Sequence, residues 1–145
     1  MAGLARGIHL VAIWLFAACA VVQVFLAGLG VFAGPDRFAL HRDFGYTFSL
    51  LLVVVLVAAI VGRLGRRQIG WVVLLMVLFA LQSVFIAFRS SAPEVAALHP
   101  VNGFLIIAVA AVSGREAWGS WRAVRRAPET RTSALVEEPG PAPIG

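Results

Sequence analysis

The sequence predicts an all-α integral membrane protein, a transmembrane four-helix bundle with up-down-up-down topology. Composition is the first observation, because 61% of the 145 residues are hydrophobic and only 13% are charged. A soluble globular chain has a far more even balance. The second observation is a set of four apolar segments, residues 8–32, 44–62, 69–88 and 101–118. Each approaches the roughly 20 residues that cross a hydrocarbon core, where helices satisfy every backbone polar group internally.

The segments differ in their ends. The first is too long for the apolar core of a secretion signal, and its lone Cys19 is interpreted as a small buried residue. The fourth is apolar only as far as Val112 and continues as an interfacial stretch. We therefore expect one transmembrane domain over residues 1–126. Residues 127–145 have neither periodicity nor apolar content and are predicted to form a disordered cytoplasmic tail.

Arginine placement predicts the orientation. All twelve basic residues are arginine. Nine lie before the first segment, between the second and third, and in or after the interfacial end of the fourth, and three lie in the other connections: Arg37, Arg42 and Arg89. By the positive-inside rule the nine face the cytoplasm, so both termini are expected to be cytoplasmic. The expected location is the cell inner (plasma) membrane. Because the arginines lie at membrane boundaries, the sequence indicates a lipid bilayer and no nucleic acid as partner.

An internal repeat relates the two helical hairpins. Residues 39–46 and 97–104 both read Ala-Leu-His-x-x-x-Gly-aromatic, and the preceding segments align Gln23 with Gln82. Two hairpins that run in the same direction are parallel repeats about a pseudo-twofold axis along the membrane normal. Such an axis places the second and fourth segments diagonally opposite in the bundle. His41 and His99 are then expected at one depth near the outer face, with side chains that converge on the axis.

Two converging histidines predict a haem site. A histidine at a helix start is often an interfacial or capping residue, and for either histidine alone that interpretation stays open. In both repeats, however, a glycine follows four residues later on the same helical face, namely Gly45 and Gly103. A haem iron takes one imidazole from each side, and residues without bulk make room for the macrocycle. The sequence therefore predicts one bis-histidine haem b, with His41 and His99 as the metal ligands and the two glycines beside it.

Other polar residues near this site are assigned more weakly. Arg42 and Arg89 lie on the outer side, where guanidinium groups would bind the haem propionates. Gln23 and Gln82 are interpreted as interhelical hydrogen-bonding residues, with a contact to each other or to a haem edge as the alternative. His9 lies at the cytoplasmic end, where no second histidine occurs, so a second bis-histidine haem is not predicted. No set of residues with catalytic spacing is found, and no catalytic residue is assigned.

The stretch Leu40-His41-Arg42-Asp43-Phe44-Gly45-Tyr46, with the leucine- and valine-rich helix that follows, resembles the haem-ligand helices of haem A synthase and its relatives. Each half of those proteins is a four-helix bundle that holds a haem between histidines on alternate helices, and this chain looks like one half. The resemblance covers residues 38–113 and implies that His41 and His99 are axial ligands. The family has a glutamate three residues before the first ligand, where this chain has Phe38 and, in the second repeat, Ala96. The oxidase activity is therefore not implied. Membership of a small uncharacterised bacterial family of four-helix membrane proteins is the other interpretation.

Two functional hypotheses follow. The first is a single-haem b-type membrane cytochrome for electron transfer near the outer face, acting with a redox partner or as a subunit of a membrane complex. The second is a cofactor-free structural or accessory subunit whose small-residue faces pack against other membrane subunits. Whether the chain is an enzyme stays open.

The arginine distribution generates a topology prediction. Reporter fusions placed after Arg67 and at the C-terminus are expected to report a cytoplasmic location, and a fusion between Ser90 and Glu94 an external one. Alkaline phosphatase and green fluorescent protein fusions at the same three sites provide the measurement. An external C-terminus would reverse the orientation and place His41 and His99 at the cytoplasmic face.

Overall fold

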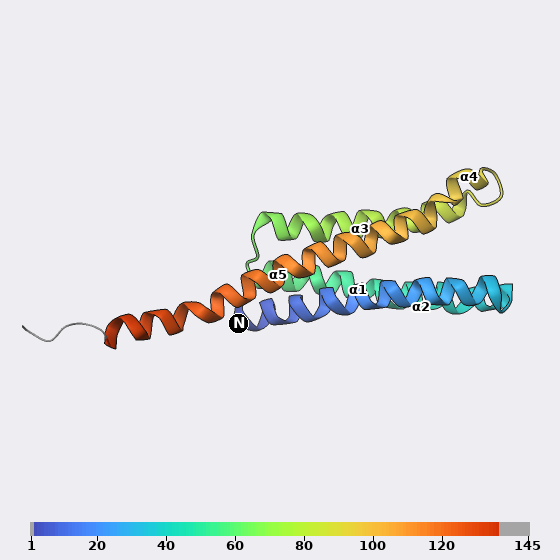
Figure 1. Cartoon of the computed structure of the whole chain (residues 1–145). Coiled ribbons are helices and arrows are strands. Elements are labelled where there is room, and N and C mark those ends of the chain that lie inside the picture. Colours follow the sequence, from blue (N-terminus) through green and yellow to red (C-terminus); the bar gives the residue numbers. More distant parts are fainter. Residues whose placement is uncertain (1, 137–145) are drawn as a thin grey trace, which may run out of the picture.

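The computed structural model describes residues 2–136, with side chains as far as Ala123. Within that range all of its secondary structure is helical, joined by short turns (Figure 1). The elements in chain order are α1 (Ala2–Phe32), the short 3₁₀ helix η1 (Pro35–Arg37), α2 (Phe38–Val61), α3 (Arg66–Ala87), α4 (Pro93–Ala96) and α5 (Leu98–Val136). Four of these helical stretches are long and apolar enough to cross a membrane. The chain is a multi-pass membrane protein.

The four long helices form the predicted up-down-up-down bundle. Neighbours in the bundle are α1 and α2, α2 and α3, α3 and α5, and α5 and α1. Helices α2 and α5 are diagonal, and among the described residues no Cα atom of one lies within 8 Å of a Cα atom of the other. The arrangement expected from two parallel hairpin repeats is therefore confirmed.

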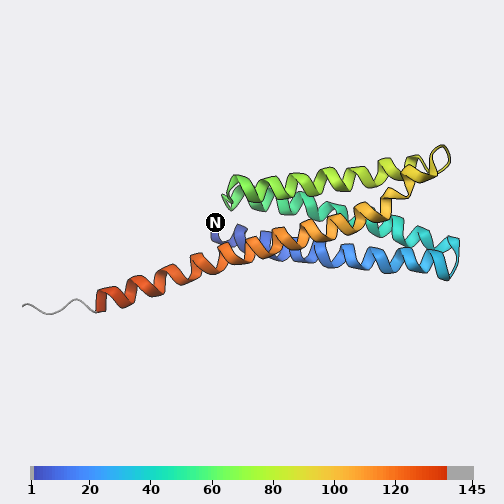
Figure 2. The same cartoon turned by 45° about the horizontal axis from the view of Figure 1, so that its top comes forward.

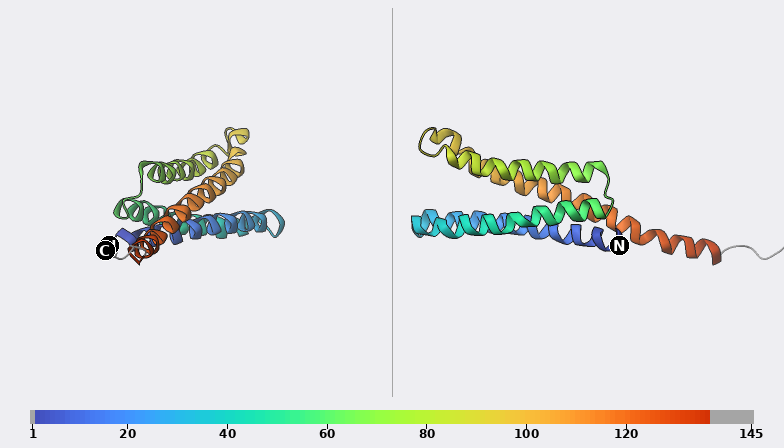
Figure 3. Two further views of the ribbon diagram at one scale, coloured as in Figure 1. Left: turned by 60° about the vertical axis from the view of Figure 1, so that its left-hand side comes forward. Right: turned by 180° about the vertical axis from the view of Figure 1, so that it is seen from behind.

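The two hairpins are not parallel along their whole length. They lie close together at the end that holds the N-terminus and the α2–α3 turn, which we call the terminal end (Figures 1 and 3). They spread apart toward the end that holds the α1–α2 and α3–α5 connections, which we call the loop end. Helix α5 continues beyond the bundle at the terminal end (Figure 2). This divergence leaves side chains, rather than backbone packing, to join the hairpins at the loop end.

The core occupies the middle of the bundle. Phe16, Val55, Val72 and Leu75, one from each of α1 and α2 and two from α3, are fully buried. Helix α5 contributes small and medium residues, including the fully buried Ala110. Most large apolar side chains outside this core are exposed, as expected where lipid rather than water covers the surface.

The helices begin earlier than the apolar segments predict. Helix α2 starts at Phe38 instead of residue 44, and α5 starts at Leu98 instead of residue 101. Hydropathy locates the hydrocarbon boundary, whereas a helix ends where its backbone hydrogen bonds end. As a consequence His41 and His99 lie inside the first turns of their helices, so each following glycine is one helical turn away on the same face.

The helical part of the C-terminal segment is longer than predicted. Helix α5 extends to Val136, so residues 127–136 are helical where a disordered tail was expected. Arginine, alanine and glutamate favour the helical state, and glycine is absent between Gly119 and Gly140, so composition without apolar periodicity does not exclude a helix. Residues 137–145 of the predicted tail lie outside the described residues.

Candidate functional site

The two repeat-related histidines meet at the loop end of the bundle. The ring centroids of His41 on α2 and His99 on α5 are 5.9 Å apart, and the rings are inclined by 66°. Both side chains are half-buried. Because the backbones of α2 and α5 stay apart, the two imidazoles bridge the diagonal of the bundle.

Each histidine is anchored in the same way by the helix that precedes it. The Nδ1 atom of His41 lies 3.0 Å from the carbonyl oxygen of Gln23 on α1. The Nδ1 atom of His99 lies 3.2 Å from the carbonyl oxygen of Gln82 on α3. A carbonyl oxygen only accepts, so Nδ1 carries the proton in both rings and donates it. In the neutral form of each ring, the lone pair is therefore on Nε2.

This pattern matches the requirements of a metal ligand. Ligating histidines usually donate their other ring nitrogen to a carbonyl or carboxylate, which fixes the tautomer and the ring orientation. An imidazole nitrogen lies about 2 Å from a bound metal and about 1 Å from its own ring centroid, so two rings on opposite sides of one ion have centroids roughly 6 Å apart. The observed 5.9 Å agrees with that separation. The ring separation is compatible with one shared metal ion.

The two glutamines lie against the two glycines. A Cβ atom added to Gly45 would lie 2.5 Å from Nε2 of Gln23, and one added to Gly103 would lie 3.4 Å from Nε2 of Gln82. In this structure each glycine thus makes room for an amide from the preceding helix. The contact is tight in the first repeat and ordinary van der Waals packing in the second. This contact gives the glycines a role that needs no cofactor. It does not test whether they border a macrocycle, which stays a prediction.

The repeats differ in how these amides are satisfied. Asn102 donates from Nδ2 to Oε1 of Gln82 at 2.9 Å and to the carbonyl oxygen of Leu78 at 2.7 Å. The repeat-equivalent residue of Asn102 is Phe44, which has no polar group. Among the described residues, Oε1 of Gln23 is the one buried side-chain oxygen or nitrogen without a hydrogen-bond partner. The first repeat thus lacks the donor that Asn102 supplies in the second.

Aromatic side chains separate the histidines from the rest of the core. Phe44 and Phe48 lie one and two turns beyond His41, with ring centroids 5.5 Å apart. Phe48 contacts Phe16 at 5.2 Å and Phe79 at 5.4 Å. This layer is apolar and closely packed, so the polar side chains of the loop end are confined to its outer side.

The arginines predicted to border the site are exposed. Arg42 donates to the carboxylate of Asp43 at 2.8 Å. Arg89 lies two residues beyond the end of α3. The structure brings His41, His99, Gly45 and Gly103 together with the two glutamines. It shows no contact of Arg42 or Arg89 with the histidine pair in the part of the chain that it describes, and their propionate-binding role stays a prediction.

A second polar cluster lies on the axis at the terminal end. His9 is fully buried, and its Nδ1 donates to the carbonyl oxygen of Val55 at 3.0 Å. Nε2 of Gln68 lies 3.0 Å from Nε2 of His9 and donates to the carbonyl oxygen and hydroxyl of Ser113 at 3.0 and 2.8 Å. Since Nδ1 of His9 is the donor, its Nε2 accepts from the amide. All polar atoms of the His9 ring are therefore used inside the protein.

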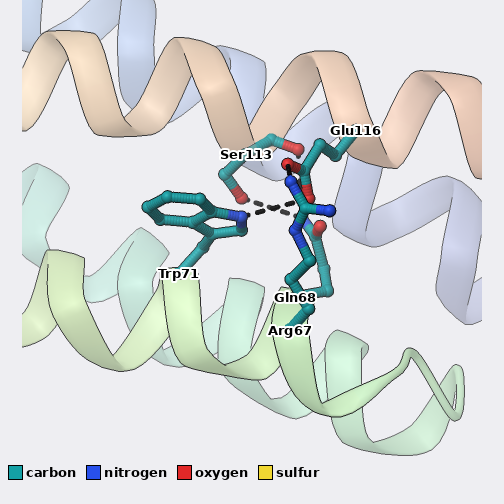
Figure 4. Close-up of polar contacts among 5 residues, drawn as sticks. All are labelled: Arg67, Gln68, Trp71, Ser113 and Glu116. Carbon is teal, nitrogen blue, oxygen red and sulfur yellow. Dashed lines mark hydrogen bonds and ion pairs between the residues drawn. The ribbon is translucent and has the colours of Figure 1, made fainter.

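Next to this cluster, α3 and α5 are joined by Glu116. Its carboxylate pairs with Arg67 and accepts a hydrogen bond of 3.0 Å from the indole of Trp71. Figure 4 shows these contacts beside the bond between Gln68 and Ser113. The ion pair is largely exposed on the arginine side, so it adds little to stability by itself.

The terminal cluster obeys the same repeat as the loop-end site. His9 and Gln68 are separated by 59 residues, as are Gln23 and Gln82. Their carbonyl partners, Val55 and Ser113, are separated by 58 residues, as are His41 and His99. A second histidine at the depth of His9 is absent from the sequence, so a histidine pair does not reveal this cluster. The repeat spacing would have pointed to Gln68.

The comparisons with known proteins cover part of the chain. Residues 23–89 are similar to a family of unknown function, DUF6220. The matched region contains Gln23, His41 and Gln82 and ends before His99. No curated protein and no solved structure matches the chain significantly.

The contacts of the two glycines generate the first structural prediction. Gly103→Ala is expected to stabilise the bundle by up to ~1 kcal/mol through helix propensity. Gly45→Ala is expected to stabilise the bundle less than Gly103→Ala, because the new methyl group displaces the amide of Gln23. Thermal unfolding in detergent compares the two, and Gln23→Ala in the Gly45→Ala background removes the clash. Equal effects of the two alanines, without coupling to Gln23, would contradict the packing described here.

The terminal cluster generates a second prediction. Gln68→Leu is expected to lower the free energy of unfolding by about 1–3 kcal/mol, because it leaves Nε2 of His9 without a donor in a buried site and removes the bonds to Ser113. Gln23→Leu is the matched control, since the Oε1 atom of Gln23 has no partner to lose. Chemical or thermal unfolding of both variants provides the comparison. A smaller loss for Gln68→Leu than for Gln23→Leu would show that the cluster does not stabilise the bundle.

Proposed function

We propose that the chain is a membrane cytochrome that binds one b-type haem between His41 and His99 and exchanges electrons near one face of the membrane. The observation that carries the proposal is the pair of imidazoles whose Nδ1 atoms are each hydrogen-bonded to a backbone carbonyl and whose ring centroids are 5.9 Å apart. Haem iron between two such ligands supplies reversible one-electron exchange without a change of ligands. His41 and His99 would hold the iron, and the carbonyl oxygens of Gln23 and Gln82 would hold the rings in orientation.

The surroundings of the pair fit such a group. The hairpins spread apart at this end, so the histidines meet where backbone packing is loosest (Figures 1 and 3). The amides at Gly45 and Gly103 are the flexible ends of long side chains, which can move when a larger group enters.

The orientation belongs to the same proposal. With nine arginines on one side, the terminal end faces the cytoplasm, both termini are cytoplasmic, and the haem lies near the outer face of the inner membrane. A soluble or membrane-bound redox partner would then approach at the α1–α2 and α3–α5 connections.

A cofactor-free accessory subunit is the second candidate. It is favoured by the contact of each glycine with a glutamine amide, because the repeated motif then serves helix packing alone. In that case His41 and His99 tie neighbouring helices through Nδ1, and the exposed apolar faces pack against lipid or partner subunits.

The absorption spectrum of the purified protein separates the two candidates. Protein made in haem-sufficient cells is expected to show a sharp Soret band and split α and β bands on reduction. His41→Gly and His99→Gly are expected to lose the haem and to recover it in the presence of free imidazole, because the small ligand fills the vacated coordination site. His9→Gln is the control and is expected to keep the spectrum, since His9 lies in the other cluster.

Two outcomes would overturn the cytochrome. A colourless, monodisperse preparation from such cells would support the accessory subunit. Copper or zinc in place of haem, found by elemental analysis and lost in both glycine variants, would keep the ligand pair but exclude the cytochrome.

A further inference from the structure

An apolar groove lies on the lipid-facing side of the first hairpin, near the terminal end. Its volume is about 320 Å³. Two residues of α1, Ala5 and Ile8, and residues of α2 from Val53 to Val61 line it. All of these side chains are apolar, so the groove suits a hydrocarbon chain and offers no hydrogen bond to a polar ligand.

Two arginines lie within two residues of the lining at the terminal end of this groove. Arg6 follows the lining residue Ala5, and its Nε donates to the carbonyl oxygen of Gly62 at 2.9 Å. This bond fixes the guanidinium between the start of α1 and the end of α2, while its terminal nitrogens remain available. Arg63, two residues beyond the lining Val61, is exposed and has a left-handed backbone with φ 51°.

The arginines of the described residues divide into those with an acidic partner and those without one. Arg37, Arg42 and Arg67 each pair with a carboxylate. Within the described residues, neither Arg6 nor Arg63 forms an ion pair. Two cations without an ion pair, next to an apolar groove, are complementary to an anion that is joined to a hydrocarbon chain.

We propose that this hairpin binds one phospholipid with a net negative headgroup. One acyl chain occupies the groove between Ile8 and Val57, and the phosphate contacts the guanidinium groups of Arg6 and Arg63. Basic pockets next to transmembrane helices recognise anionic headgroups in this way, and a guanidinium matches phosphate oxygens bidentately. The proposal does not depend on the haem.

Native mass spectrometry tests the site on the full-length protein. The protein is released from detergent containing equal amounts of phosphatidylglycerol and phosphatidylcholine with identical acyl chains. One retained phosphatidylglycerol is expected. Arg63→Gln is expected to weaken the retention of phosphatidylglycerol about fivefold, because one arginine near an anionic headgroup contributes about that factor to binding. Arg89→Gln is the control, an exposed arginine without an acidic partner at the loop end.

A second pair of variants tests the groove. Val57→Trp fills it and is expected to reduce retention of the phospholipid, whereas Val77→Trp on α3 is expected to leave retention unchanged. The two valines are matched, with exposed fractions of 53% and 52%. Equal retention of the two lipids, or equal effects of the two tryptophans, would overturn the proposal. A dimer that disappears with Val57→Trp would also overturn it, by showing that a second copy of the chain covers the groove.

Discussion

Polar side chains in the interior of this bundle must find their partners within the protein, because hydrocarbon offers none. That constraint shapes both ends of the molecule. Each long helix satisfies its own backbone, so the side chains that cross the pseudo-twofold axis decide how the two hairpins meet. His41 and His99 meet at the loop end, and His9 and Gln68 meet at the terminal end. Every one of these four uses a carbonyl oxygen of a neighbouring helix as its anchor.

The repeat explains how much of this could be predicted from the sequence. The four spans follow from hydropathy, and the diagonal placement of α2 and α5 follows from two hairpins of the same direction. The convergence of His41 and His99 follows from the same symmetry. These features depend on residue types that the repeats share, so comparison of one half with the other reveals them.

Features that depend on differences between the repeats could not be read in the same way. Gln68 stands where the first repeat has His9, and Asn102 stands where it has Phe44. A search for matching residues passes over such positions, although each decides a hydrogen bond in the structure. The start of α2 at Phe38 and the end of α5 at Val136 were also missed, because hydropathy marks the membrane boundary and not the end of a helix.

The differences give the two ends different chemical capacity. At the terminal end, the amide of Gln68 occupies Nε2 of His9, the helices are close, and the axis is filled by a closed set of hydrogen bonds. At the loop end, the repeat-equivalent bonds leave two imidazoles with free Nε2 atoms and one glutamine oxygen without a donor. The terminal end therefore uses its polar groups within the protein, and the loop end retains ring nitrogens that could bind a ligand.

A cofactor held at the loop end would lie on one side of the aromatic layer formed around Phe48, with no counterpart beyond it in the described residues. Electron exchange by such a protein would then take place at a single face of the membrane, and electrons would not pass across it through a chain of sites.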